Sequence, residues 1–382
     1  MTLSTPIIKE DVVAPQTEDK SLSQHRSSLK LIDCDVHQAL EKPEHLFPYL
    51  SANYVQNIKD FGLMAPRLGY TNVPGHGARD DLWETTDYSG PNPSTQPEVA
   101  SKRHLDEYGI DLAVLTGGAE VYSMAVQNDP DYAAAVCRAY NDWTHDHWLS
   151  TDSRLRGSIH ISPVDPQLAA EEIHRLGSRP EFVQVMMPGA AKMPFGNRFY
   201  HPIYEACAEY DLPVCSHFGS EGAGFANAPT PVGYPTYYLE MRMARPLTAM
   251  AHTTSLICEG VFEKYPNFRF LFIEQDFFWI AGLMWHLDQD WKGLREYTPW
   301  VKKLPSEYIR QHIRVGSQPL PDTPTREDLK TLLKWVHADE IMVYASDYPH
   351  WDWDEPKTFL QGFDSKLRQR ILVDNAKELY GL

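Results

Sequence analysis

Short apolar runs alternate along the chain with stretches of helical periodicity. Patterns with the period of an amphipathic helix cover residues 129–149, 165–177, 201–211 and 324–339. The apolar runs are rich in Val, Ile, Leu or Phe and have the length of a buried parallel strand. These eight runs lie at residues 29–37, 110–117, 154–163, 181–189, 212–219, 268–275, 313–319 and 340–350. Such an alternation of buried strands and helices predicts a (β/α)8 TIM barrel.

A doubly wound open sheet is the alternative architecture. It would usually carry a glycine-rich phosphate loop after its first strand, and DCDVHQALEKPEH at residues 33–45 is not one. Two connections, 38–109 and 220–267, are too long for plain loops and are predicted to be insertions after strands 1 and 5. In a barrel both would lie on the active face. Residues 1–28 are polar and are expected to form a tail before a barrel domain at 29–382.

Composition narrows the choice of partners. The 382 residues carry a net charge of −17 and no Lys/Arg cluster, so a nucleic acid would be repelled. No apolar run reaches the length of a membrane span, and the N-terminal stretch lacks the basic and apolar regions of a secretory signal. Five widely spaced cysteines without a C-x-x-C pair fit a reducing cytosol. We therefore expect a cytoplasmic protein that acts on a small molecule, with neither nucleic acid nor membrane as a partner.

Two ligand-type side chains close the first apolar run. Because side chains alternate along a strand, Asp33, Asp35 and His37 lie on one face. Asp35 and His37 are then about 6.6 Å apart along the strand, at its carboxyl end. Zn²⁺ and Mn²⁺ both accept such a mixture of carboxylate and imidazole. The alternative is that the carboxylates cap turns and His37 is a loop residue, because a D-x-H pair is common by chance.

Two further strand ends carry the same kind of side chain. His217 ends the fifth run, in VCSHFGSEG, and Asp347 follows IMVYAS in the eighth. Packing does not readily explain ligand-type residues at the same end of three strands, and a barrel would bring them into one site. Three or four protein ligands with an open water position are typical of a catalytic metal. We therefore predict one divalent ion, held by Asp35, His37, His217 and Asp347.

Glu274 and His350 are candidates for acid–base chemistry. Glu274 lies at the end of the sixth run, FRFLFIEQ. It is a candidate general acid/base or extra metal ligand, and the alternative is a salt-bridge partner at the rim of the barrel. Its place at the same strand end favours a functional role. His350, three residues after Asp347, is either close to the substrate or a partly exposed loop histidine. The predicted catalytic set is Asp347, Glu274 and His350, and Asp33 is expected to be a partner inside the barrel without contact to the ion.

Several segments resemble the amidohydrolase superfamily. They are LIDCDVH, LDEYGIDLAVLTG, AYNDW, GVFEKYPNFRFLFIEQDFFW and YASDYPHWD, in the family's order across roughly residues 30–380. The branch that they resemble contains aminocarboxymuconate-semialdehyde decarboxylase and the resorcylate-type decarboxylases. The resemblance implies a distorted (β/α)8 barrel with one divalent ion, Zn²⁺ first and Mn²⁺ as the alternative. It also implies a homodimer or a larger homo-oligomer.

The family's ligand pattern matches the four predicted ligands, with two departures. The first-strand pair of the family, His-x-His or Glu-x-His, matches Asp35 and His37. Its fifth-strand histidine matches His217, and its eighth-strand aspartate matches Asp347. The first ligand is here an aspartate, a shorter arm with a negative charge. The decarboxylases also carry a catalytic histidine at the end of the sixth strand, where this chain has Glu274. A glutamate donates a proton near neutral pH only when burial or a neighbouring charge raises its pKa.

The leading hypothesis is a metal-dependent enzyme that decarboxylates, without oxidation, a carboxylated aromatic or enol-type small molecule. The ion would polarise the substrate, and Asp347 or Glu274 would protonate the carbon from which CO₂ leaves. The second hypothesis is a metal-dependent hydrolase of an amide, ester or lactone, with Asp347 as the acceptor of a proton from water. A third is a barrel that binds a small ligand without turnover.

Overall fold

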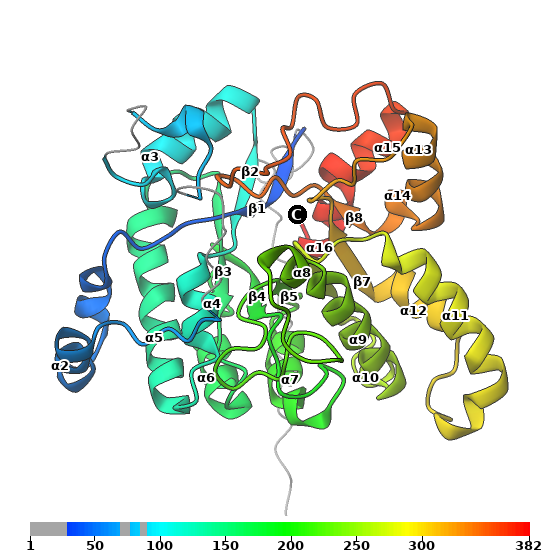
Figure 1. The fold of residues 1–382 in the computed structure, drawn as a ribbon, viewed down its shortest axis with the longest axis horizontal. Coiled ribbons are helices and arrows are strands. Elements are labelled where there is room, and N and C mark those ends of the chain that lie inside the picture. Colours follow the sequence, from blue (N-terminus) through cyan, green and yellow to red (C-terminus); the bar gives the residue numbers. More distant parts are fainter. Residues whose placement is uncertain (1–28, 69–76, 85–89) are drawn as a thin grey trace, which may run out of the picture.

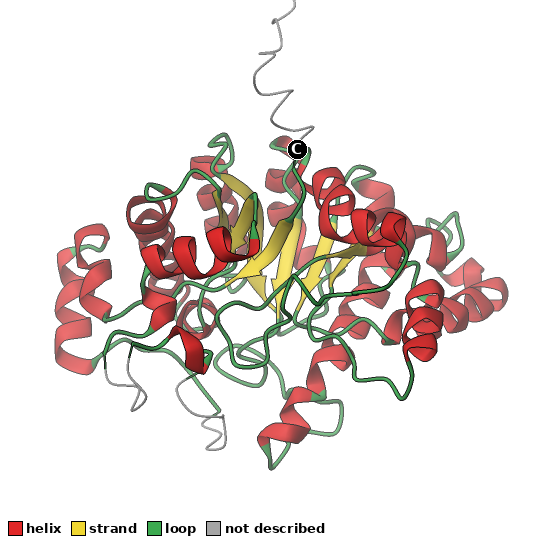
Figure 2. Ribbon diagram, turned by 90° about the horizontal axis from the view of Figure 1, so that it is seen from above, coloured by secondary structure: helices red, strands yellow, loops and turns green. Residues whose placement is uncertain are grey.

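The computed structural model describes residues 29–68, 77–84 and 90–382, so the predicted tail at 1–28 lies outside the described residues. Eight parallel strands follow one another in sequence order around a barrel, with helices on the outside (Figures 1 and 2). The predicted TIM barrel is confirmed. The strands are β1 (Ile32–Val36), β2 (Leu112–Leu115), β3 (Leu155–His160), β4 (Phe182–Pro188), β5 (Val214–His217), β6 (Phe270–Ile273), β7 (Ile313–Gly316) and β8 (Met342–Val343).

Helices cover the outer faces of the strands, which explains why the strands are rich in apolar residues and almost entirely buried. All residues of β4 (FVQVMMP) and β6 (FLFI) are buried, for example. None of the described helices is both long enough and apolar enough to cross a bilayer. The α-helices are α2 (Ala52–Phe61), α3 (Pro97–Ala100), α4 (Ala119–Ala125), α5 (Pro130–Thr144), α6 (Pro166–Leu176), α7 (His201–Glu209), α8 (Tyr238–Arg242), α9 (Ala244–Cys258), α10 (Val261–Lys264), α11 (Trp279–Leu294), α12 (Pro305–His312), α13 (Arg326–Trp335), α14 (Ala338–Ile341), α15 (Ser365–Gln369) and α16 (Asn375–Tyr380).

The four helices predicted from the sequence begin within two residues of the predicted starts. Two of the predicted helical ranges are not a single α-helix to their ends. Asp165 caps α6, since its side chain accepts two backbone N–H groups of the first turn. Thr325 caps α13 in a reciprocal pair with Asp328. The pattern at 324–339 is split into α13 and α14, because His337 adopts a left-handed φ of 55° between them. The pattern at 129–149 forms α5, which continues as a wider π turn from His145 to Leu149.

Two connections on the carboxyl side of the strands are long, at the positions where the sequence predicts insertions. Residues 37–111 join β1 to β2 and contain α2 and α3, and residues 218–269 join β5 to β6 and contain α8, α9 and α10. Figure 2 shows loops gathered beside the strands on one side of the barrel. Both connections contribute side chains to the cavity at the strand ends, including Leu68 from the first and Arg242 from the second.

The barrel is closed by backbone hydrogen bonds between β1 with His37 and the segment that follows β8, residues 344–348. Cys34 donates its N–H to the Tyr344 carbonyl at 2.9 Å, and Asp347 donates to the Asp35 carbonyl at 3.2 Å. His37 donates to the Tyr348 carbonyl at 2.7 Å. This β1–β8 seam brings the first and the last predicted ligands of the chain side by side.

Asn141, in the AYNDW segment, joins α5 to β3 and α6. Its side-chain amide donates to the His160 carbonyl at 2.9 Å and to Glu172 at 2.7 Å, and its oxygen accepts the His160 N–H at 2.8 Å. Replacing it by Leu removes these hydrogen bonds from the buried peptide groups of His160, whereas Glu172 keeps its ion pair with Arg175. We expect Asn141→Leu to lower the free energy of unfolding by about 1–3 kcal/mol, measured by urea denaturation. Arg138→Leu, an exposed position on the same helix, is the control, and equal losses in both variants would contradict this role.

Candidate metal centre

The predicted ligands converge at the carboxyl ends of three strands. Asp35 lies in β1 and His37 follows it, His217 ends β5, and Asp347 follows β8. Their exposures are 0%, 2%, 2% and 1%, respectively. Charged groups buried to this degree require a partner or a bound ion.

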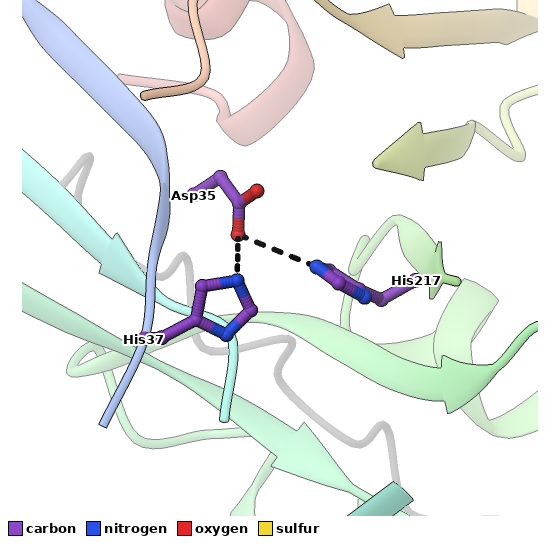
Figure 3. Close-up of side chains that lie close together, drawn as sticks. All are labelled: Asp35, His37 and His217. Atoms are coloured by element: carbon purple, nitrogen blue, oxygen red, sulfur yellow. Dashed lines mark ion pairs between the residues drawn. The ribbon is translucent and has the colours of Figure 1, made fainter. Parts of the chain in front are cut away.

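Asp35, His37 and His217 form a compact cluster (Figure 3). The Asp35 Oδ1 atom lies 3.4 Å from His37 Nε2 and 3.7 Å from His217 Nε2. Each of the three residues offers a ligand atom within 4.8 Å of the others. The Thr116 hydroxyl donates to Asp35 Oδ1 at 2.6 Å and fixes the carboxylate. Asp35 Oδ2 is buried and has no hydrogen-bond partner among the described residues.

Hydrogen bonds on the far side of each ring orient the two histidines. His37 Nδ1 donates to the Gly117 carbonyl at 2.5 Å, and His217 Nδ1 donates to the Phe218 carbonyl at 2.6 Å. In the neutral rings each Nε2 atom then carries the lone pair, and neither has a hydrogen-bond partner within the described parts of the chain. Metal-binding histidines almost always donate their other ring N–H in this way. The two Nε2 atoms and Asp35 Oδ2 therefore fit a divalent cation.

The carboxylates around His37 make the cluster attractive to positive charge. Burial by itself lowers the pKa of His37, but the negative charges of Asp35 and Asp347 outweigh it and raise the pKa to about 10. The protein without a cation would therefore hold a proton on this ring. A divalent ion would have to displace that proton, since metal binding requires the neutral imidazole.

Asp347 joins the cluster through His37 and is paired with His350. Asp347 Oδ1 lies 3.0 Å from His37 Nε2 and 2.5 Å from His350 Nδ1, and Gln318 donates to Oδ2 at 3.0 Å. These contacts place His350 beside Asp347 in the centre, with its side chain 39% exposed. Burial would raise the pKa of Asp347, but His350 and His37 hold it below its ordinary value. Asp347 thus stays ionised at neutral pH.

Glu274 follows β6 and borders the cluster, and it is also a salt-bridge partner. Its Oε2 atom lies 3.7 Å from His217 Nε2, and Arg245 of α9 donates to Oε1 at 2.9 Å. Burial raises the pKa of Glu274, Arg245 opposes that effect and Asp347 adds to it. Glu274 and Asp347 have left-handed φ values of 51° and 64°. Such backbone conformations are costly outside glycine and concentrate at functional positions.

A cavity of about 340 Å³ lies over the cluster. The residues that line it include His37, His217, Glu274, Asp347, His350, Tyr122, Arg242 and Trp351. Its volume is near the lower end for ligand sites, which suits a small molecule. The aromatic side chains offer flat apolar surface for a planar substrate.

Several side chains of the site were not predicted from the sequence, among them Tyr122, Arg245 and Glu221. Tyr122 of α4 stacks on His217 with ring centroids 4.9 Å apart. Arg245 of α9 supplies a buried cation, and Glu221 is only 3% exposed at the wall of the cavity. Tyr122 and Arg245 come from helices, so no strand-end position marks them. Glu221 follows His217 closely in HFGSEG, and that spacing was the available signal.

A barrel that gathers histidine and carboxylate side chains at the carboxyl ends of its strands has the architecture of a metal-dependent TIM-barrel enzyme. The sequence profile of the family described as Amidohydrolase matches residues 32–382. The chain therefore belongs to the amidohydrolase family, and the resemblance noted in its sequence is confirmed.

Known proteins similar to this chain include decarboxylases. Gamma-resorcylate decarboxylase of Polaromonas sp. (strain JS666 / ATCC BAA-500) is 23% identical over 305 residues, 73% of this chain and 86% of that protein. An amidohydrolase from Mycobacterium avium subsp. paratuberculosis K-10 is 20% identical with a TM-score of 0.70, covering 93% of this chain and 98% of that one. The 5-carboxyvanillate decarboxylase of Novosphingobium aromaticivorans DSM 12444, solved with manganese and 4-hydroxy-3-methoxy-5-nitrobenzoic acid, is 20% identical with a TM-score of 0.67, covering 93% and 97%. These two solved structures share the fold of this chain.

Glu221 makes the stability of the protein depend on pH. Burial raises the pKa of its carboxyl from 4.5 to about 8. Between those values the folded protein keeps a proton that the unfolded chain releases. The free energy of unfolding therefore falls as pH rises through this window, by up to about 1.4 kcal/mol per pH unit from this group.

We expect Glu221→Gln to remove this contribution. Urea denaturation at a series of pH values should show the variant gaining stability relative to the wild type between pH 4.5 and about 8. Glu209→Gln, at an exposed position of α7, is the control and should show no such trend. A difference between Glu221→Gln and wild type that stays constant with pH would contradict the assignment.

Proposed function

We propose that the protein is a metal-dependent decarboxylase of a small carboxylated aromatic acid. The observation that carries the proposal is the buried cluster of Asp35, His37 and His217, with the Asp347–His350 pair beside it under a small cavity. The similarity to gamma-resorcylate and 5-carboxyvanillate decarboxylases supports this reaction class.

The proposed ligands are Asp35, His37, His217 and Asp347. Two imidazoles and two carboxylates accept Zn²⁺, the ion expected from the sequence, and also Mn²⁺. The manganese in the 5-carboxyvanillate decarboxylase makes Mn²⁺ the first ion to test. When bound, the ion would act as a Lewis acid that orients and polarises the substrate.

The Asp347–His350 pair is the proposed proton source. Decarboxylation breaks the bond between the ring carbon and the carboxylate, releases CO₂ and forms a C–H bond with one added proton. His350 Nδ1 lies 2.5 Å from Asp347 Oδ1, so a protonated His350 donates to the ionised carboxylate. Asp347 is buried in the site, whereas His350 is partly exposed and able to take a new proton from solvent.

Glu274 has a supporting role in this proposal. Its raised pKa would let it act as an acid, but Arg245 engages its carboxylate and favours the ionised form. We assign Glu274 to the electrostatic balance of the site beside His217. In this assignment Glu274 does not take over the proton transfer that the sequence resemblance assigns to a histidine at this position of the decarboxylases.

Hydrolysis is the second candidate function, favoured by the lowered pKa of Asp347. An ionised carboxylate suits a general base that accepts a proton from water. The two reactions differ in their products. Hydrolysis places an oxygen atom from water in an acid product, whereas decarboxylation releases CO₂ without adding water.

A substrate screen on protein loaded with Mn²⁺ or Zn²⁺ tests the reaction class. The panel contains mono- and dihydroxybenzoates together with small lactones and amides. We expect one equivalent of CO₂ for each phenol formed, loss of activity on chelation, and recovery when the ion returns. Incorporation of ¹⁸O from labelled water into an acid product, without CO₂, would contradict decarboxylation and support hydrolysis.

Variants of the Asp347–His350 pair test the proton source. We expect His350→Gln to keep the bound metal and lower kcat by about 10²–10⁴-fold, the usual size of an acid–base contribution. Asp347→Asn should lose at least as much activity, while Glu274→Gln should retain more than either. The control is His286→Gln, which disrupts a surface histidine–aspartate pair with Asp290. Full activity in His350→Gln with one bound ion would remove His350 from the mechanism.

A further inference from the structure

A buried pair lies behind the metal centre and takes no part in the chemistry proposed above. Asp33 belongs to β1, and His104 belongs to the π turn Ser101–Asp106 in the β1–β2 connection. Both are 0% exposed, and His104 Nε2 donates to Asp33 Oδ2 at 2.7 Å. Burying such a pair is costly unless further hydrogen bonds satisfy it. The remaining contacts of Asp33 therefore indicate what the pair does.

The other oxygen of Asp33 binds the backbone next to two proposed ligands. Asp33 Oδ1 accepts the N–H of Asp35 at 3.2 Å and the N–H of Ser346 at 2.9 Å. Asp35 is itself a proposed ligand, and Ser346 directly precedes Asp347. One carboxylate thus fixes peptide groups on both sides of the β1–β8 seam.

His104 is held against the same seam by a ring stack. Its imidazole lies over the Tyr348 ring, with centroids 4.3 Å apart and 22° between the planes. The Tyr348 carbonyl accepts the His37 N–H at 2.7 Å, and the Tyr348 N–H donates to the Ser346 hydroxyl at 3.0 Å. The Asp33–His104 pair therefore contacts the backbone segments that carry Asp35, His37 and Asp347.

We propose that Asp33 and His104 are positioning residues that set the affinity and geometry of the metal centre. The inference rests on the ligand set given under the proposed function. Without His104, the Asp33 carboxylate loses the donor that fixes Oδ2 and can rotate away from the two N–H groups. Asp35 and Asp347 would then be held less firmly, and the ion would bind more weakly. Loss of a group that orients metal ligands typically costs about 10–100-fold in affinity.

His104→Phe tests this role, because the phenyl ring preserves the stack on Tyr348 and removes the hydrogen bond to Asp33. His312→Phe is the matched control. His312 is 3% exposed, donates to the Phe268 carbonyl at 2.8 Å and also stacks on an aromatic ring. It ends α12 just before β7, at the opposite end of the barrel from the site.

The readouts are Mn²⁺ binding to the metal-free protein by calorimetry and the EPR spectrum of the bound Mn²⁺, which reports the symmetry of its ligands. We expect His104→Phe to weaken Mn²⁺ binding about 10–100-fold and to alter the spectrum, and His312→Phe to stay within about twofold of wild type. His104→Gln keeps an N–H donor for Asp33 and should recover part of the affinity. Thermal unfolding of each variant reports its stability separately.

Wild-type affinity and spectrum in folded His104→Phe would overturn the inference. An equal loss of affinity in His312→Phe would overturn it too, because the effect would then follow from general destabilisation. If His104→Phe does not fold, Asp33→Asn takes its place, since its amide removes the acceptor facing His104, and unchanged Mn²⁺ affinity there is again a refutation. Failure of the wild-type protein to bind any divalent ion would instead refute the ligand set of the proposed function.

Discussion

The metal centre depends on the backbone hydrogen bonds of the β1–β8 seam. Asp35 and His37 come from the first strand, and Asp347 follows the last. The bond from the Asp347 N–H to the Asp35 carbonyl, 3.2 Å long, brings these distant parts of the chain into register. A shift of one residue along the seam would turn ligand side chains to the wrong face of the strands. The position of His350, which is paired with Asp347, also follows from this closure.

Negative charge is concentrated where the barrel can least solvate it. Asp35, Asp347 and Glu274 converge on two histidines in a buried region, and Arg245 adds a permanent positive charge beside Glu274. Such an arrangement is costly for the folded chain by itself, because buried charge loses its hydration. A divalent cation would offset that cost. The left-handed backbone at Glu274 and Asp347 also costs stability, and it fixes the geometry of the site.

Most of the barrel, and the place of four ligand-type side chains at the carboxyl ends of its strands, could be predicted from the sequence, because both follow from local patterns. An apolar run of strand length specifies a buried strand, and a polar residue at its end specifies a place on the active face. The positions of His217 and Asp347 on the active face were predicted in this way. Tyr122 and Arg245 could not be found by the same reasoning, since they extend from α4 and α9, and no helical position by itself reveals which side chain reaches a site.

The sequence by itself determined the order of strands and helices, the polar character of the strand ends and the family. Only the tertiary structure decided which of these residues meet. In the folded chain His350 is paired with Asp347, and Arg245 forms a salt bridge with Glu274. Asp33 has a buried hydrogen-bond partner in His104, 71 residues away. The physical reason is that strand and helix patterns act over a few residues, whereas contacts between side chains are fixed by barrel closure and by the paths of the long connections. Hydrophobic periodicity carries no information on those paths.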